Sequence, residues 1–132
     1  MNDAELLIAR LRLVAEIEAK FKLVDQLRDR CIQKVEKIQQ RQGETNVVEI
    51  LDANAKKLEA LGRQLVEAEP AFTELTERYK TASANVGDIA DQRFDRTAPA
   101  IPRSLERLQS VLEAELFVLD DLISQLEGRR GS

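Results

Sequence analysis

Apolar residues recur along the first part of the chain with the seven-residue spacing of helices that pack side by side. This spacing places two rows of positions on one helix face, and eight of these ten positions are apolar. The rows are Leu7, Val14, Phe21, Arg28 and Val35, and Arg10, Ile17, Val24, Cys31 and Ile38. Asn2 followed by Glu5 predicts a capped helix start, and Gly43 predicts an end in the left-handed conformation. We therefore expect a first helix of about 40 residues, roughly 60 Å long.

A second helix is predicted to begin at Asn46, because Asn46 and Glu49 repeat the spacing of Asn2 and Glu5. Its heptad rows extend to about residue 91. They are Leu51, Leu58, Leu65, Phe72, Tyr79 and Val86, and Val47, Asn54, Leu61, Ala68, Leu75, Ala82 and Ile89. Pro70 either separates two helices or bends a single one, since it removes one backbone hydrogen bond. The heptad phase is unbroken across Pro70, so we predict a bent, continuous helix.

The heptad pattern is lost between residues 92 and 103. Pro99 and Pro102 favour extended conformations in the residues that precede them, so this segment is predicted to be a linker. A third helix is expected over residues 104–128, and residues 129–132 are expected to form a disordered tail. The core rows of the third helix are Leu105, Leu112, Leu119 and Leu126, and Leu108, Glu115 and Leu122.

The short connection at residues 43–46 predicts an antiparallel, coiled-coil-like hairpin of residues 1–91. Leu6 and Leu13 widen the apolar face of the first helix far from this turn, whereas Lys34 and Arg41 occupy the same face near it. The third helix is therefore predicted to fold back over the remote half of the hairpin. The expected fold is all-α, with a three-helix base and a two-helix tip. Packing of the third helix against a partner protein is an alternative that the linker equally permits.

The residue types that most catalytic and metal sites require are sparse. The chain has no His and one Cys, and its five Gly residues stand apart from one another. Acid–base catalysis by His, metal sites built from His or Cys, and phosphate-binding glycine loops are therefore not expected. We predict a non-enzymatic protein without metal or cofactor, in which Cys31 is a buried structural thiol.

Charge and hydropathy limit the partners further. The net charge of −4 disfavours nucleic acid as the main partner. No apolar run exceeds four residues, whereas a transmembrane helix needs about 20. The single Cys and the absence of a signal-like start add to this prediction of an intracellular, cytoplasmic protein, with the nucleus also open.

Polar residues within the core rows and clustered cations are the candidate binding residues. Arg28 and Asn54 interrupt the rows, where such residues can fix register or oligomeric state. Arg28 is equally well explained by a side chain that extends from a loosely packed layer to water. For the cations near the tip and in the linker, a solvated surface is the simplest account. The candidate partner-binding residues are Arg28, Lys34, Lys37, Arg41, Arg93, Arg96, Arg103, Leu116, Phe117 and Ile123.

The general form, a heptad-rich hairpin followed by a Pro-containing linker and a terminal helix, resembles small helical subunits of kinetochore, motor-adaptor and vesicle-tethering complexes. It is also similar to bacterial secretion chaperones. The resemblance is one of fold alone and rests on no shared motif. We therefore expect a scaffold or adaptor subunit that oligomerises or binds protein partners by coiled-coil packing. The alternatives are a rod that binds the cytoskeleton or a membrane surface through its basic patches, and a secretion-type helical chaperone.

Overall fold

The computed structural model describes residues 2–130, and the side chains of residues 2–128. Every regular element in this range is helical, which confirms the all-α prediction. The elements are α1 (Asp3–Gln39), α2 (Thr45–Ala53), α3 (Ala55–Ser83), α4 (Arg93–Thr97), the short 3₁₀ turn η1 (Ala98–Ala100) and α5 (Ile101–Arg130).

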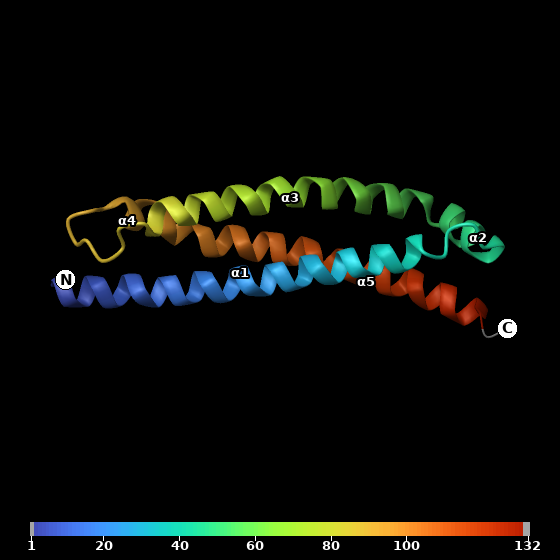
Figure 1. The fold of residues 1–132 in the computed structure, drawn as a ribbon, viewed down its shortest axis with the longest axis horizontal. Coiled ribbons are helices and arrows are strands. Elements are labelled where there is room, and N and C mark those ends of the chain that lie inside the picture. Colours follow the sequence, from blue (N-terminus) through green and yellow to red (C-terminus); the bar gives the residue numbers. More distant parts are fainter. Residues whose placement is uncertain (1, 131–132) are drawn as a thin grey trace.

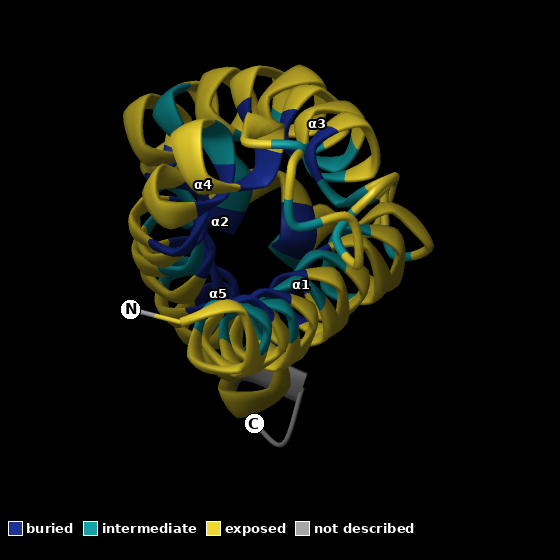
Figure 2. Ribbon diagram, turned by 90° about the vertical axis from the view of Figure 1, so that its left-hand side faces the viewer, coloured by how far each residue is buried: buried dark blue, intermediate teal, exposed yellow. Residues whose placement is uncertain are grey.

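Three long helices, α1, α3 and α5, lie lengthwise in an elongated bundle (Figure 1). α5 runs in the same direction as α1, and α3 runs in the opposite direction. α5 is the main neighbour of α1 and also packs on α3, whereas the backbones of α1 and α3 rarely approach each other. Buried residues line the inner faces of the helices when the bundle is viewed along its axis (Figure 2). α5 is therefore central to the packing, although the sequence suggested that it covers one end only.

Local signals set the two ends of α1. The Asn2 side-chain oxygen accepts a hydrogen bond from the backbone N–H of Glu5 at 2.8 Å, as predicted. Gly43 has a φ of +98°, which confirms the predicted left-handed turn. The predicted cap at Asn46 is wrong, because α2 begins at Thr45 after Glu44. The Glu44 carboxylate pairs with Arg41 at 2.8 Å, and this ion pair joins the two sides of the turn.

The helical segment after this turn is interrupted at Asn54, where the heptad pattern predicts no break. Asn54 is buried and has φ and ψ of −110° and 16°, so it separates α2 from α3. Its side-chain amide donates to the carbonyl of Ile50 at 2.7 Å and to Gln125 of α5 at 3.3 Å. A side chain that bonds its own backbone in this way competes with helical hydrogen bonding. Pro70 lies inside α3, which confirms the prediction that it does not end the helix.

The segment between α3 and α5 is partly helical, so the expectation of extended conformations before Pro99 and Pro102 is wrong, and α5 begins inside the predicted linker over residues 92–103. α3 ends at Ser83, and α4 and η1 lead directly into α5. Ala98 and Ile101, the residues before the two prolines, both have right-handed helical angles. Proline disfavours these angles without forbidding them, and it tolerates the first turn of a helix. Burial of Phe94, Ala98 and Ile101, each at most 2% exposed, compensates for the local cost.

α5 reaches the tip of the bundle, so the predicted two-helix tip is also wrong. Lys34 and Lys37 near the end of α1 pair with Asp120 and Glu127 of α5. At the other end of the bundle, Arg10 of α1 binds residues between Val86 and Asp95, and α4 and η1 pack on α3. α5 extends to Arg130, beyond the predicted end at residue 128, and residues 131–132 of the predicted tail lie outside the described residues.

The core is a continuous layer of aliphatic side chains between the long helices. Cys31 is fully buried in it, which confirms the predicted position of this thiol. Within residues 2–130, no helix combines the length and the apolar character needed to cross a bilayer. The four members of the central α5 row are each at most 2% exposed: Leu105, Leu112, Leu119 and Leu126.

Candidate functional site

On α1, and likewise on α2 and α3, one of the two heptad rows is more deeply buried than the other. One row is buried, from Arg10 to Ile38 in α1 and from Val47 to Ala82 in α2 and α3. Every member of the other row is only half-buried, from Leu7 to Val35 in α1 and from Leu51 to Val86 across the turn. These half-buried rows border the α1/α3 seam, where the two backbones stay apart. The seam is thus an apolar surface that the chain covers incompletely.

Large aromatic side chains close the seam in the half nearer the N-terminus. The Phe21 ring of α1 meets Phe72 of α3 edge-on, with 5.8 Å between ring centres, and lies 5.6 Å from Tyr79. The Tyr79 hydroxyl donates a hydrogen bond to Glu18 at 3.1 Å. Burial and this hydrogen bond raise the pKa of Tyr79 to about 12. We call this part of the seam the closed half.

Arg28 marks the end of the closed half. Its guanidinium carbon lies 4.6 Å from the centre of the Phe72 ring, a cation–π contact. Its Nη1 donates to Asp25 at 2.9 Å, and its Nε lies 2.8 Å from a Glu69 oxygen without hydrogen-bond alignment. The candidate residue Arg28 therefore joins α1 to α3 within this chain.

Beyond Arg28, towards the tip, aliphatic side chains replace the aromatic ones and the seam opens into a groove. A hollow of about 550 Å³ lies between α1 and α3, with Val35 and Leu65 on its sides and Leu112 of α5 at its floor. A second hollow of about 230 Å³ shares Val35 and Leu65 and continues to Leu51 and Leu119. We call the two adjoining hollows the α1/α3 groove and this part of the seam the open half.

The rim of the groove carries exposed apolar side chains and one unpaired acid. Ile32 of α1 is 45% exposed, and Val66 of α3 is 74% exposed. Glu36 also lines the groove, and its carboxylate has no ion-pair or hydrogen-bond partner among the described residues. Exposed apolar residues that flank an apolar groove are typical of a protein-binding surface.

Arg10 fixes the opposite end of the bundle. It is 2% exposed, and all five of its N–H donors find acceptors. Two of them contact Asp95, at 3.1 and 2.6 Å, and the other three bind the carbonyls of Val86, Asp88 and Asp91 at 2.8 to 3.1 Å. The hydrogen bond with Asp95 raises the pKa of Arg10. Arg10 thereby gathers the turns of residues 84–92 onto α1, which is a structural role.

Glu115 is the opposite case, a buried charged group without partners. It is 1% exposed on α5, and neither of its carboxylate oxygens has a hydrogen-bond partner among the described residues. Burial raises its pKa to about 7. Cys31 of α1 lies in the same region, donates weakly to the carbonyl of Leu112 at 3.7 Å, and has a pKa raised to about 11 by burial and by Glu115.

Most of the candidate cations are neutralised by acids of the same chain. Lys34 pairs with Asp120, and Lys37 pairs with Glu127 at 3.2 Å. Arg41 and Arg93 likewise pair with Glu44 and Asp91; the Arg93 pair is 2.7 Å long and holds the pKa of Asp91 well below its usual range. Arg96 contacts Gln92 at 3.4 Å, and Arg103 is exposed. The predicted basic patches are therefore local networks of ion pairs rather than uninterrupted positive surfaces.

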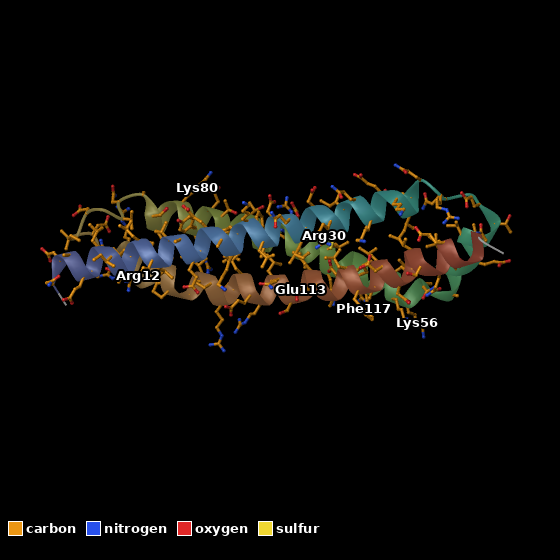
Figure 3. All side chains as sticks on the ribbon, turned by 90° about the horizontal axis from the view of Figure 1, so that it is seen from below. Arg12, Arg30, Lys56, Lys80, Glu113 and Phe117 are labelled. Atoms are coloured by element: carbon orange, nitrogen blue, oxygen red, sulfur yellow. The ribbon has the colours of Figure 1, made fainter. Side chains whose placement is uncertain are left out.

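The three apolar candidates on α5 have different surroundings. Leu116 is 9% exposed and belongs to the core, and Ile123 packs against it half-buried. Phe117 is 77% exposed and lies on the outside of α5 (Figure 3). None of the three lines the α1/α3 groove. Their role in binding a partner stays a prediction.

Arg10 and Glu115 occupy core heptad rows in the sequence, and neither was among the predicted binding residues. Their presence at otherwise apolar heptad positions was the available signal, as it was for Arg28 and Asn54. The groove left no such signal, because an incompletely covered heptad row has the same sequence as a covered one.

Side chains that could bind a metal ion do not cluster in the described part of the chain. Among residues 2–128, no three His, Cys, Asp or Glu side chains are grouped so that they could hold a metal ion. Comparison with known proteins found no matching family model, no matching curated protein and no matching solved structure. The α1/α3 groove and the buried polar residues are therefore the features of the described chain that bear on its function.

Proposed function

We propose that this protein is a non-catalytic helical scaffold or adaptor subunit that binds an amphipathic helix of another protein in the α1/α3 groove by coiled-coil packing. The observation that carries the proposal is the half-buried state of both heptad rows beside the groove. In coiled coils, residues of such rows insert between residues of a facing helix. A helix laid in the groove supplies that partner and buries Val35, Leu65 and Val66.

The dimensions of the groove suit one helix of moderate length. The groove is lined from Arg28 in α1 to Gln42 in the turn that follows this helix, a span of roughly 20 Å at 1.5 Å per residue. An amphipathic helix of about four turns matches this length and presents apolar residues with the i, i+3/i+4, i+7 spacing to both rows.

Charge at the rim favours a partner helix with basic flanks. Among the described residues, Glu36 on the α1 side has no partner, and the Glu69 carboxylate on the α3 side pairs only with Arg28. A Lys or Arg beside the apolar stripe of the partner would pair with Glu36 and fix the orientation of the helix. Binding of a charged membrane or filament through the basic patches has less support, because Lys34, Lys37 and Arg93 pair within the chain.

A synthetic stapled helix of about four turns tests the proposal, with Leu on one face and Lys on its flanks. We expect it to bind the protein in a fluorescence anisotropy titration. Val66→Asp should weaken binding by roughly tenfold or more, because an unpaired buried carboxylate costs more than about 1.4 kcal/mol. Phe117→Asp is the matched control, since it makes the same kind of change on the outside of α5.

Charge exchange at the rim adds a second test. Glu36→Lys should favour a helix with Glu flanks over one with Lys flanks, whereas Glu113→Lys, which changes net charge equally on α5, should leave the preference unaltered. The proposal fails if neither helix binds or if Val66→Asp and Phe117→Asp act alike. It also fails if sedimentation shows that the wild type is a dimer that Val66→Asp dissociates, because a second copy would then occupy the groove.

A further inference from the structure

A second groove runs along another side of α3, in the seam between α3 and α5. Its largest hollow has a volume of about 500 Å³ and is lined by α3 over residues 64–78 and by α5 over residues 104–111. Hollows of about 190 and 450 Å³ adjoin its two ends. The three hollows, which we call the α3/α5 groove, follow α3 over residues 57–82, a span of about 37 Å at 1.5 Å per residue.

Small and aliphatic side chains line the floor of the groove. Ala68 and Leu75 of α3 and Leu108 of α5 are each at most 8% exposed. Ala71 and Val111 also line the groove, and they are exposed and half-buried, respectively. Two antiparallel helices with an apolar groove between them form one half of a four-helix bundle.

The two rims of the groove carry opposite charges. Glu67 lines it on the α3 side, and Arg107 lines it on the α5 side. Both residues are exposed, and neither has an ion-pair or hydrogen-bond partner among the described residues. Glu74 and Arg78, also on the α3 rim, pair with each other at 2.9 Å. The unpaired charge is therefore negative on the α3 rim and positive on the α5 rim.

This charge arrangement is complementary to a second copy of itself. A two-fold axis parallel to the bundle places α3 of each copy against α5 of the other, so the acidic rim faces the basic rim. Because α3 and α5 run in opposite directions, all neighbouring helices of the resulting four-helix bundle are antiparallel, which is the usual up-and-down arrangement (Figure 1). A two-fold axis across the helices would instead bring like charges together.

We propose that two copies of this protein associate through their α3/α5 grooves, with Glu67 of each copy paired to Arg107 of the other. Ala71 and Val111 of both copies then fill the centre of the interface, and the two reciprocal ion pairs border it and fix its register. A helix of another protein would need cations along one flank and anions along the other, whereas a second copy supplies both.

The dimer goes beyond the proposed binding of a helix and does not depend on it. Ala68 borders both the α1/α3 groove and the α3/α5 groove, so the two lie on different faces of α3. A dimer formed through the α3/α5 groove leaves the α1/α3 groove open in each copy. The two proposals can therefore fail separately.

Sedimentation equilibrium of the full-length protein over a range of concentrations tests the association. We expect a monomer–dimer equilibrium. Glu67→Arg and Arg107→Glu should each raise the dissociation constant by roughly tenfold or more, because each change sets like charges against each other twice in a symmetric interface. The double variant should regain much of the lost affinity, since it exchanges the two charges and restores the pairs.

Two further variants separate the apolar floor from general effects of charge. Ala71→Glu places a carboxylate in the centre of the interface and should weaken the dimer by roughly tenfold or more. Ala71 is exposed in the single chain, so this variant should still fold. Arg63→Glu reverses a charge at an exposed position of α3 that lies outside the groove, and it should leave the dimer unchanged. Circular dichroism verifies that each variant is folded.

Three outcomes would overturn the proposal. The first is a monomer at every concentration. The second is a dimer that tolerates both Glu67→Arg and Arg107→Glu, or a double variant that remains as weak as the single ones, because side chains that do not meet cannot be rescued by exchange. The third is a dimer that only Val66→Asp dissociates, which would place the second copy in the α1/α3 groove.

Discussion

The closed and open halves of the α1/α3 seam are built on the same heptad pattern and differ in what occupies it. In the closed half, Phe21, Phe72 and Tyr79 span the gap between the two helices. In the open half, Val35 and Leu65 occupy the equivalent positions and leave hollows of about 550 and 230 Å³. Because the backbones of α1 and α3 stay apart along the seam, side-chain size decides whether the gap is filled.

The two halves also differ in whether their buried polar residues have hydrogen-bond partners. Arg10, at the end of the closed half, has all its donors paired and is bound within the fold. Glu115, beneath the open half, has no hydrogen-bond partner among the described residues. A fold satisfies buried polar groups wherever it is complete by itself. If the groove binds a helix as we propose, the closed half stabilises the bundle by itself and the open half is completed by the partner.

Loss of the Arg10 network should have the largest effect. Arg10→Met leaves Asp95 and three carbonyls without their donor. Because the Asp95 side chain is 37% exposed, we expect a loss of about 3 kcal/mol, at the lower end of the range for breaking a buried ion pair. Urea unfolding followed by circular dichroism measures this loss. Arg12→Met is the control. Arg12 lies two residues further along α1 and is exposed, so its replacement should change stability little. Equal stability of the two variants would show that the turns of residues 84–92 do not depend on Arg10.

The open half should make stability depend on pH through Glu115. Folding raises the pKa of Glu115 from its ordinary value of 4.5 to about 7, so the folded chain holds this proton more tightly than the unfolded chain. The associated stability is complete below about pH 4.5, declines as pH rises to about 7, and stays lost above it. This shift corresponds to about 3 kcal/mol at 1.36 kcal/mol per unit.

The measurement is the free energy of unfolding at several pH values for the wild type and Glu115→Gln. The stability difference between the two should change across this range, with the Gln variant gaining relative to the wild type as pH rises. Cys31, the titratable α1 neighbour, has a pKa of about 11 and does not titrate in this range. Glu113→Gln serves as an exposed control. A constant difference between wild type and Glu115→Gln would contradict the prediction.

Truncation within one heptad row compares the two halves directly. Phe72→Ala removes the ring that contacts both Phe21 and Arg28, and we expect a loss of about 2 kcal/mol, below the full core value because Phe72 is half-buried. Leu65→Ala, one heptad earlier, should cost about 1 kcal/mol, since one side of Leu65 already faces the groove. Thermal unfolding of both variants tests this order, and a larger loss at Leu65 would reverse our assignment of the two halves.

Filling the groove should convert the open half into a closed one. Leu65→Phe places an aromatic ring beside Val35 and should stabilise the protein by about 0.5–1 kcal/mol, as cavity filling commonly does. The same change should weaken binding of the Lys-flanked helix. Stability is measured in urea and binding by fluorescence anisotropy. Tighter binding in Leu65→Phe would mean that the helix does not enter the groove.

The smallest effect is expected for the ion pair between Lys37 and Glu127. Both side chains are more than half exposed, so solvent screens their attraction. Lys37→Met should change the free energy of unfolding by less than about 1 kcal/mol. Chemical denaturation measures this, and a loss as large as that of Phe72→Ala would show that the tip depends on its surface charges.

The sequence predicted single elements better than their arrangement. The cap at Asn2, the left-handed turn at Gly43, the continuous helix across Pro70 and the burial of Cys31 each follow from one residue and its near neighbours, and each is confirmed. The break at Asn54 was missed because heptad spacing does not register side-chain hydrogen bonds, and the Asn54 amide bonds both the Ile50 carbonyl and Gln125, 71 residues away in the chain.

The prolines gave a false boundary for a related reason. Local preference favours extended angles before Pro99 and Pro102, but burial of Ala98 and Ile101 against the long helices outweighs that preference. The helical path of residues 93–100 then carries α5 to the tip. The wrong expectation for the residues before the two prolines therefore accompanied a wrong prediction of where α5 lies.

By itself, the sequence determined an all-helical chain with two apolar rows on each long helix, because heptad spacing is a property of consecutive residues. Only the tertiary structure decided which row is buried and which borders an incompletely filled seam. The reason is that burial depends on the distance between backbones, which α5 sets by packing between α1 and α3. The partners of Arg10 and the absence of partners for Glu115 were decided in the same way, because segments far apart in the sequence must meet to supply them.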